Sequence, residues 1–332
     1  MKRIAIITSG GDAPGMNAAI RAATLTAIKN GCEVFGVIRG YQGLINGEIT
    51  ELTSLAVSDI LHRGGTILHS ARSKEFATAE GREKAVQTLH DFGIEGVVVI
   101  GGDGSFRGAL ELTKLGFATV GIPGTIDNDI ECTDLSIGFD TALNTVLDSI
   151  NKIRDTAVSH DRVYVVEVMG KNSGFIALYS ALAGGADAVL IPEVEPDLDK
   201  VVQRIETVSR IGRRHSIVIV AEGIFGDPLS GRAFSESAAF KVATYINLKV
   251  KKDTRVTILG HIQRGGSPSA LDRTLGTRFG AKAVELLLDG ENGMMVGWVD
   301  HDLKVSPMEE AIARKKRVEP EVYALAETLT SI

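Results

Sequence analysis

Two stretches of the chain place small and acidic residues directly after short apolar runs. Residues 97–100 run into Gly101-Gly102-Asp103-Gly104-Ser105, and residues 120–122 run into Pro123-Gly124-Thr125-Ile126-Asp127-Asn128-Asp129. In an open α/β sheet, the loops at the carboxyl ends of the strands face the ligand. The first loop offers bare backbone and one carboxylate, and the second offers a hydroxyl group and two carboxylates. These groups could bind a phosphate and a divalent cation, and a carboxylate among them could remove the proton from a substrate hydroxyl group.

The first loop lies between a predicted strand and a predicted helix. Backbone N–H groups at a helix N-terminus bind phosphate, and glycine allows a ligand to approach closely. The alternative is a tight βα turn in which Asp103 only caps the helix. Gly10-Gly11-Asp12 has the same form after residues 4–7, so the two turns are expected to face one cleft.

The second loop carries the candidate general base. In an extended loop, alternation would turn Thr125, Asp127 and Asp129 to one side. Two like charges so close need a cation, and magnesium held by Asp103 or Asp129 would leave Asp127 as the base. The alternative is that Asp127 and Asp129 are solvated loop residues.

Basic residues recur at the ends of predicted strands, where arginine forks would match phosphate geometry. They are Arg72, Arg162, Arg255, His261 and Arg264. Singly each could be a surface residue, but together they indicate a phosphorylated substrate, with Glu222 accepting hydrogen bonds from sugar hydroxyls. A second basic set indicates either a further anion site or a solvated charged face: Arg21, Arg154, Arg213, Arg214 and His215.

Composition limits the class of protein. With 332 residues, 44% of them hydrophobic, the chain can form one large or two medium soluble domains. A net charge of −6 argues against general nucleic-acid binding, and no apolar stretch approaches the ~20 residues of a membrane span. Only Cys32 and Cys132 are present and no signal-peptide pattern precedes Ser9, so we expect a cytoplasmic protein.

Apolar runs alternate with helical patterns along the chain, which predicts a mostly parallel sheet covered on both faces. Strands are expected at 4–7, 33–38, 97–100, 120–122, 162–169, 188–191, 216–221 and 255–259. Helices are expected at 16–30, 80–92, 105–115, 138–158, 174–182, up to Arg210 from a cap at Asp197 or Asp199, up to Val250, and at 272–288. Asn46-Gly47 predicts a β-hairpin. Neither a P-loop motif nor a dinucleotide fingerprint is present.

The set of motifs resembles the family of bacterial ATP-dependent 6-phosphofructokinases over essentially the whole chain. The resemblance rests on residues 8–17 (Thr-Ser-Gly-Gly-Asp-Ala-Pro-Gly-Met-Asn), 101–105, 123–129 and 260–266 (Gly-His-Ile-Gln-Arg-Gly-Gly). It implies phosphorylation of fructose 6-phosphate by Mg-ATP, a committed step of glycolysis.

The resemblance also implies residue roles. Asp127 would take the proton from the 1-hydroxyl of the sugar, assisted by Thr125, Arg72 and Lys171, and Asp103 would bind Mg²⁺. ATP would be held by Gly11, Arg72, Ser73, Gly102, Asp103, Gly104 and Ser105. Fructose 6-phosphate would be held by Thr125, Asp127, Arg162, Met169, Gly170, Lys171, Glu222, Arg255, His261 and Arg264.

The implied fold has two doubly wound three-layer α/β/α domains with mostly parallel sheets. Both would be discontinuous, with residues 1–138 plus 251–303 binding ATP and residues 139–250 plus 304–332 binding fructose 6-phosphate. The implied assembly is a homotetramer in which Arg162 and Arg255 act across a subunit interface, without nucleic acid or membrane partners.

Departures from the family pattern bear on donor and regulation. Diphosphate-using relatives carry an aspartate at Gly104 and a lysine at Gly124, so these glycines favour ATP. Lys171 stands where arginine is usual. The family's effector site would include Arg21, Leu25, Arg154, Gly185, Asp187, Ile211, Arg213 and His215. Cations are usual at Leu25, Ser54 and Ile211, so we expect feeble effector control. The segment 226–253 is about a dozen residues longer than is common.

Two other functions compete with this reading. A kinase for another substrate, such as a NAD kinase, also uses a Gly-Gly-Asp-Gly turn but would not need residues 260–266 or the arginines. A non-catalytic sugar-phosphate sensor on the same scaffold would not need Asp127 and Asp103.

Overall fold

A computed structural model describes residues 1–226 and 237–329 of the chain. It contains two compact units, each assembled from separate stretches of sequence. Unit 1 comprises Met1–Ile126, Ile130–Thr141 and Arg264–Lys316, and unit 2 comprises Asp127–Asp129, Ala142–Gln263 and Arg317–Ile332. The predicted extension at 226–253 overlaps residues 227–236, which lie outside the described residues.

The largest differences between the two units and the predicted domains lie in two stretches, and residues 127–129 and 139–141 also change sides. Residues 251–263 belong to unit 2, because strand β9 (Thr254–Ile258) pairs with β6 (Val163–Val168). Residues 304–316 belong to unit 1, because strand β11 (Asp302–Pro307) pairs with β10 (Met294–Val299). Strand pairing therefore decides both boundaries.

Unit 1 is built on a seven-stranded sheet whose two outer strands alone are antiparallel to their neighbours. Its order is β11, β10, β5 (Ala118–Pro123), β4 (Gly96–Gly101), β1 (Arg3–Ser9), β2 (Glu33–Val37) and β3 (Ile49–Glu51). The central strands are mostly apolar and buried along nearly their whole length, as expected for parallel strands that are covered on both faces.

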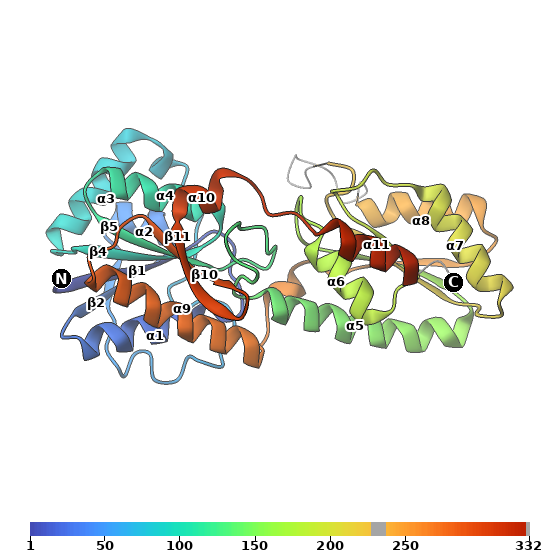
Figure 1. Ribbon diagram of the computed structural model, residues 1–332, viewed down its shortest axis with the longest axis horizontal. Helices are drawn as coiled ribbons and strands as arrows, with labels where there is room; N and C mark the ends of the chain where they lie inside the picture. Colours follow the sequence, from blue (N-terminus) through green and yellow to red (C-terminus); the bar gives the residue numbers. More distant parts are fainter. Residues whose placement is uncertain (227–236, 330–332) are drawn as a thin grey trace. The chain divides into compact units, whose positions relative to one another are not determined.

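Helices cover both faces of this sheet (Figure 1). Helices α1 (Met16–Lys29) and α9 (Ala270–Leu288) lie on one face. The other face carries α2 (Gly40–Asn46), η1 (Glu75–Ala77), α3 (Ala79–Asp91), α4 (Asp103–Lys114) and α10 (Met308–Ala313). On that face alternate strand residues such as Val97 and Val99 pack with Phe106 of α4, as the two-residue period of a strand requires.

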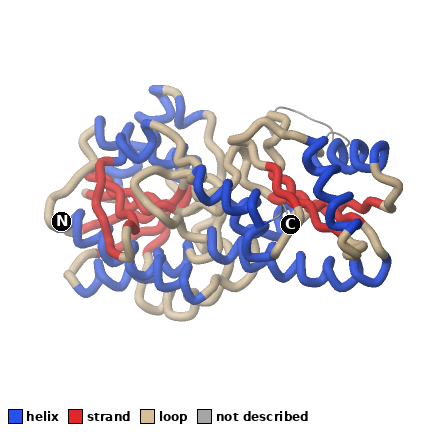
Figure 2. Tube along the Cα trace, turned by 45° about the vertical axis from the view of Figure 1, so that its right-hand side comes forward, coloured by secondary structure: helices blue, strands red, loops and turns tan. Residues whose placement is uncertain are grey.

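Unit 2 is built on a four-stranded sheet, and strands are drawn in red in Figure 2. All of its strand pairs are parallel. Its order is β7 (Ala188–Leu190), β8 (Ser216–Ala221), β6 and β9. Its helical elements are α5 (Phe139–His160), α6 (Phe175–Gly184), α7 (Leu198–Arg210), α8 (Ala238–Lys249), η3 (Gly260–Arg264) and α11 (Pro320–Leu329). Helices α5 and α6 lie on one face and α7 and α8 on the other (Figure 1), which confirms the predicted three-layer α/β/α fold class.

Most predicted elements are present within a few residues of their expected bounds, including the cap of α7, where the Asp197 side chain accepts a hydrogen bond from Lys200 N. The hairpin predicted at Asn46-Gly47 is wrong. Helix α2 ends at Asn46, and Gly47 (φ 71°) is its left-handed C-cap. A helix C-cap and a two-residue hairpin turn both favour a glycine in the left-handed conformation. The Asn-Gly dipeptide alone therefore does not distinguish a helix end from a hairpin.

Within unit 1, which includes the chain as far as Thr141, a buried carboxylate from α9 holds the residues that begin α5. Asp272 is 1% exposed, and its oxygens accept hydrogen bonds from Gly138 N (2.7 Å), Thr141 N (2.8 Å) and Thr141 Oγ1 (2.5 Å). Burial raises the pKa of Asp272 to about 6, against the lowering effect of these hydrogen bonds. The folded protein therefore holds a proton on this group more tightly than the unfolded chain does.

This raised pKa predicts a pH-dependent stability term. The contribution of Asp272 is fully present below its unfolded pKa of 3.8 and is lost as pH rises through about 6. Replacing Asp272 with Asn removes this titration. Denaturant unfolding from pH 4 to pH 7 should therefore show the Asp272→Asn variant gaining about 2 kcal/mol relative to wild type. The exposed Asp289→Asn variant is the control, and an Asp272→Asn difference that does not change with pH would contradict the prediction.

Across residues 1–226 and 237–329, no helix combines the length and apolar character that crossing a membrane requires.

Candidate active site

The two Gly-Gly-Asp turns lie side by side in unit 1. Strands β1 and β4 are neighbours, with Ser9 opposite Gly101, and the chain leaves β1 toward β2 on one side and β4 toward β5 on the other. The sheet therefore changes winding direction between β1 and β4, which is where open α/β sheets bind ligands. The turns at residues 10–12 and 101–105 both lie at this switch point, at the ends of neighbouring strands.

Close backbone contacts explain the glycines of the second turn. Ser105 Oγ donates a hydrogen bond to Ser9 O (3.0 Å), and a Cβ on Gly101 would lie 2.5 Å from the same oxygen. By contrast, a Cβ on Gly104 would meet nothing within 4 Å, so the space beside the first turn of α4 is open. The first N–H groups of a helix have no partner within the helix and can hold phosphate oxygens.

Asp103 is the first residue of α4, and each of its two carboxylate oxygens forms an ion pair with a basic side chain. Arg107 Nε lies 2.7 Å from Oδ1, and Lys315 Nζ lies 3.0 Å from Oδ2. Burial by itself would raise the pKa of Asp103, but hydrogen bonds from Arg107 and Lys315 outweigh it and hold this pKa below its usual value. The site therefore favours the ionised form of the carboxylate.

The donor chemistry around Asp103 fits magnesium. Among the described residues, no cluster of three or more His, Cys, Asp or Glu side chains could hold a metal. Mg²⁺ is usually bound by one or two carboxylates together with substrate phosphates and water, so a single ionised aspartate beside a phosphate-binding turn meets that requirement.

Two further segments reach the turn at residues 10–12. Ser70 Oγ donates a hydrogen bond to Gly10 O (2.5 Å), and the exposed Arg72 follows it. Arg264 donates from Nη1 to Asp12 O (3.1 Å), and a Cβ on Gly11 would lie 2.5 Å from this Nη1. Arg264, which is expected among the sugar-binding residues, belongs to unit 1 and lies against Gly11.

In unit 2, Asp127 is 2% exposed and lies beside Lys171. The Lys171 Nζ is 3.5 Å from Asp127 Oδ2, and Ser173 Oγ donates a hydrogen bond to Asp127 O (3.0 Å). A buried carboxylate next to an ammonium group is suited to act as a base whose charge is balanced nearby.

The loop that carries Lys171 is fixed at the carboxyl ends of β6 and β8. Lys171 N donates a hydrogen bond to Glu222 Oε1 (2.9 Å), and a Cβ on Gly223 would lie 1.9 Å from Lys171 O. Burial raises the pKa of Glu222, and the nearby Asp127 carboxylate raises it further. Gly170 (φ 135°) and Lys171 (φ 52°) both have left-handed backbone conformations, so the local geometry is unusual for a lysine.

The segment that follows the carboxyl end of β9 also contacts the loop after β6. Met169 N donates a hydrogen bond to Gln263 Oε1 (3.3 Å), and Gln263 is fully buried. The exposed His261 lies in η3, two residues before it. Sequence reasoning missed Gln263, although it stands between His261 and Arg264 in a motif that was recognised.

The loop at residues 124–129 is not extended as predicted. Asn128 has a left-handed backbone (φ 51°), and the preceding two residues form a turn. Alternation therefore fails: Asp127 is buried, whereas Asp129 is partly exposed. In unit 1, Ser136 Oγ fixes the loop by donating a hydrogen bond to Thr125 O (2.6 Å).

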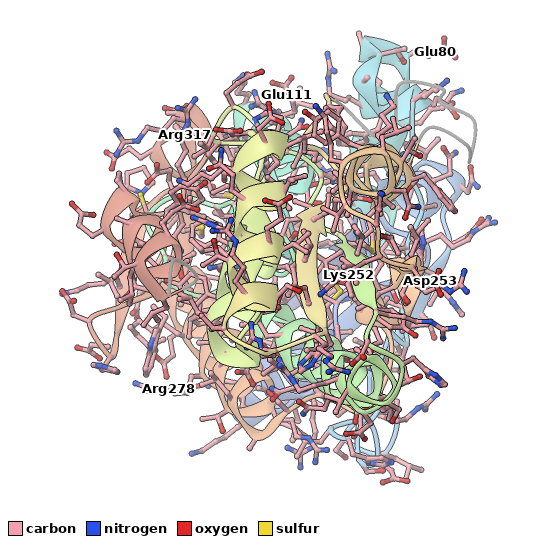
Figure 3. All side chains as sticks on the ribbon, turned by 90° about the vertical axis from the view of Figure 1, so that its right-hand side faces the viewer. Glu80, Glu111, Lys252, Asp253, Arg278 and Arg317 are labelled. Carbon is pink, nitrogen blue, oxygen red and sulfur yellow. The ribbon has the colours of Figure 1, made fainter. Side chains whose placement is uncertain are left out.

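Arg162 and Arg255 lie together at the opposite end of the sheet. Arg162 Nε and Arg255 Nη2 lie 2.7 and 2.9 Å from Asp253 Oδ2. Asp253 and Lys252 are labelled on the turn before β9 in Figure 3. Arg162 precedes β6 and Arg255 is the second residue of β9, so the prediction that both lie in carboxyl-end loops is wrong. The length of β6 separates them from Glu222 by roughly 20 Å.

Most of the predicted effector residues gather in unit 2, and Arg21 and Leu25 lie on α1 of unit 1. Arg154 Nη2 donates to Gly185 O (3.2 Å), and Arg213 forms an ion pair with the buried Asp187. Burial lowers the pKa of His215, helped by the nearby cations Arg213 and Arg154. A cavity of about 280 Å³ lies here, and its lining includes the exposed Ile211.

Comparison with known proteins agrees with these features. The family model described as Phosphofructokinase matches residues 3–287. The ATP-dependent 6-phosphofructokinase of Halothermothrix orenii is 55% identical over 331 residues, covering 99% of this chain and all of that protein. The protein of the same name from Bacillus pumilus is 54% identical, with the same coverage.

The solved structures that resemble this chain include phosphofructokinases. Pichia pastoris phosphofructokinase in the T-state is 37% identical with a TM-score of 0.87, covering 99% of this chain and 36% of that longer chain. A pyrophosphate-dependent phosphofructokinase from Marinobacter aquaeolei has a TM-score of 0.83 at 20% identity, covering 100% of this chain and 92% of that one, so it shares the fold. On the match to the family model and to its full-length relatives, the chain belongs to the phosphofructokinase family.

Proposed function

We propose that this protein is an ATP-dependent 6-phosphofructokinase, which converts D-fructose 6-phosphate and ATP to fructose 1,6-bisphosphate and ADP. The observation that carries the proposal is Asp127, a buried carboxylate beside Lys171 in a loop that directly follows the β5 strand. The names of its full-length relatives support the same reaction.

The reaction transfers a phosphoryl group. The 1-hydroxyl oxygen of the sugar attacks the γ-phosphorus of ATP, the bond from that phosphorus to the β,γ-bridging oxygen breaks, and ADP leaves. Asp127 accepts the hydroxyl proton, while Thr125 assists. Arg72 and Lys171 offset negative charge on the transferring group, because positioning and charge neutralisation dominate this kind of catalysis.

Unit 1 binds the nucleotide in this proposal. ATP is held by Gly11, Arg72, Ser73, Gly102, Asp103, Gly104 and Ser105. The open space at Gly104 and the N-terminus of α4 accommodate the phosphates. Asp103 holds Mg²⁺, which when bound neutralises charge on the phosphates of ATP.

Unit 2 binds the sugar phosphate. Its proposed contacts come from Asp127, Met169, Gly170, Lys171, Glu222 and His261. Thr125 and Arg264 also bind the sugar phosphate in this proposal. Glu222 accepts hydrogen bonds from sugar hydroxyls at the end of β8.

We further propose a cytoplasmic homotetramer. Arg162 and Arg255 lie at the amino end of the unit 2 sheet, where they cannot contact a ligand at the carboxyl ends of the same sheet. In a tetramer they would bind the phosphate of the sugar held by a neighbouring subunit. The free thiols of Cys32 and Cys132 suit a reducing compartment.

The activity test is an assay for fructose 1,6-bisphosphate formation, with ATP and diphosphate offered separately in the presence of Mg²⁺. Product should form with ATP and not with diphosphate. Turnover with diphosphate alone would contradict the proposed donor, and no turnover with either donor would contradict the proposed function.

Gly104 gives the donor proposal a sharper test. We expect Gly104→Asp to lower kcat/KM for ATP by about 100-fold, because like charges brought together cost several kcal/mol. A side chain here meets open space, so the melting temperature should not change. Gly104→Ala is the control for added volume without charge. An active Gly104→Asp variant with an unchanged KM for ATP would show that this position does not face the donor.

Regulation is expected to be weak. Leu25, Ser54 and Ile211 remove three cations from the effector site that the family resemblance implies, and fewer cations bind an anion less tightly. A fructose 6-phosphate titration with and without phosphoenolpyruvate should therefore show nearly the same half-saturation. Introducing Ile211→Arg tests the cause, because it should increase the effect of phosphoenolpyruvate. A large shift in the wild-type protein would refute this expectation.

A further inference from the structure

The loop of residues 62–73 carries Arg72 and Ser73, and buried polar side chains fasten it to β1 and α1. Thr8, in β1, is fully buried, and its Oγ1 donates a hydrogen bond to His69 O (2.7 Å). Thr8 Oγ1 also lies 3.0 Å from Thr66 Oγ1. Neither threonine has a role in the site described above, and their hydroxyl groups contact the loop, not the sheet.

A second buried side chain holds the same loop from α1. Asn17 is 1% exposed, and its Oδ1 accepts a hydrogen bond from Ile67 N (2.8 Å). Its Nδ2 donates to Arg63 O (3.0 Å) and lies 3.3 Å from Gly64 O. A buried amide whose bonds all run to one loop fixes the path of that loop.

The loop needs this support because its backbone is strained at His69. His69 has a φ of 55°, a left-handed conformation that residues with a side chain seldom adopt. Such a conformation persists only where the surrounding structure holds it, and it often marks a functional position. The carbonyl that Thr8 binds is that of His69 itself.

Arg72 lies between two further anchors. Before it, Ser70 Oγ donates to Gly10 O (2.5 Å), and after it, Ser73 Oγ donates to Gln42 Oε1 (2.8 Å). The backbone around Arg72 is therefore fixed on both sides, although the side chain itself is exposed.

We propose that Thr8 is a positioning residue for Arg72, with Asn17 as a second clamp. Its hydrogen bond to His69 sets the loop before ATP arrives, so that Arg72 already faces the nucleotide phosphates. Without it, part of the binding energy of ATP must order the loop, and affinity falls. This inference rests on the proposed function, because it assumes that Arg72 binds ATP.

The test compares isosteric changes at two buried threonines of unit 1. Thr8→Val should raise the KM for ATP about 3- to 10-fold, the usual effect of one hydrogen bond, and leave the KM for fructose 6-phosphate unchanged. Thr8→Ser keeps the hydroxyl group and should restore wild-type values. Thr24→Val is the matched control, because Thr24 is also fully buried and its hydroxyl has no hydrogen-bond partner within the described chain.

A double mutant shows whether Thr8 acts through Arg72. In an Arg72→Ala background, Thr8→Val should cause little further rise in the KM for ATP. Additive effects, an equal rise in both KM values, or an impaired Thr8→Ser variant would overturn the proposal. If Thr8→Val does not fold, Ser70→Ala removes a more exposed anchor of the same loop and should raise the same KM.

Calorimetric titration with Mg-ATP alone separates this inference from the proposed function. If the wild-type protein binds Mg-ATP without turning over fructose 6-phosphate, the proposed function fails. The weaker binding expected of Thr8→Val is still measurable in that case, and equal affinity in the two proteins would overturn the role of Thr8.

Discussion

Replacing Asp127 with Asn should lower kcat by about 10²- to 10⁴-fold, the range of a positioned general base. The substitution keeps the size of the side chain, and the hydrogen bond from Ser173 Oγ goes to the backbone oxygen, so the fold of the loop should persist. The proposed ATP-binding residues are in unit 1, so the affinity for Mg-ATP should remain close to that of wild type. Steady-state kinetics and calorimetric titration with Mg-ATP measure the two effects separately.

The control for Asp127→Asn is a carboxylate elsewhere in unit 2. Asp161 forms an exposed ion pair with Arg214 (3.3 Å), and its change to Asn should leave kcat unaltered. An Asp127→Asn variant with nearly full turnover would exclude Asp127 as the base. A variant that loses Mg-ATP affinity and turnover together would indicate a role in nucleotide binding instead.

Replacing Arg162 with Ala should raise the KM for fructose 6-phosphate by about 10- to 100-fold, because a hydrogen bond to a charged group contributes about 1.5–3 kcal/mol. Lys252→Ala, on the turn beside Asp253 (Figure 3), is the control and should have little effect. The KM for ATP should not change in either variant.

Mixed oligomers test whether Arg162 acts on a neighbouring subunit. An Asp127→Asn chain and an Arg162→Ala chain are each impaired alone. Expressed together, they form some sites in which an intact Asp127 meets an intact Arg162 from the neighbour, and activity should return. If mass spectrometry shows mixed oligomers and activity does not return, Arg162 does not act across the interface.

The sequence predicted those parts of the molecule that depend on local pattern. Glycine and aspartate directly after an apolar run located the turns at residues 10–12 and 101–105, because strand end and turn are neighbours in the chain. Asp127 was found by the same signal. The family resemblance then assigned roles that a pattern of single residues could not distinguish.

Contacts between distant segments gave no such signal. Asp272 reaches Gly138, and Lys315 reaches Asp103, across separations that no periodicity records. The positions of Arg162 and Arg255 were predicted wrongly although both residues begin expected strands. In a parallel sheet the first residues of the strands lie together at the amino end, so their order in the chain already placed them away from the carboxyl-end loops.

Turn residues led to one hairpin that was predicted wrongly and one hairpin that was not predicted. The Asn46-Gly47 pair ends a helix, whereas β10 and β11 form the hairpin that was not predicted. The two residues between those strands are Asp300 (φ 52°) and His301 (φ 67°), which take left-handed conformations without glycine. Aspartate and histidine tolerate this conformation better than most residues, but the pair lacks the glycine that makes a two-residue hairpin recognisable in a sequence.

Unit 1 is assembled from three separate stretches of the chain, so it cannot fold completely while the ribosome is still making the middle of the protein. Strands β1, β4 and β5 emerge early, but their partner β10 and the covering helix α9 are translated only near the end. Translation adds roughly 5–20 residues per second, so the apolar face that α9 covers remains uncovered for roughly 10–30 s after β5 is made. Unit 1 therefore cannot be completed until most of the chain has been made, and the face that α9 covers stays open to solvent until then.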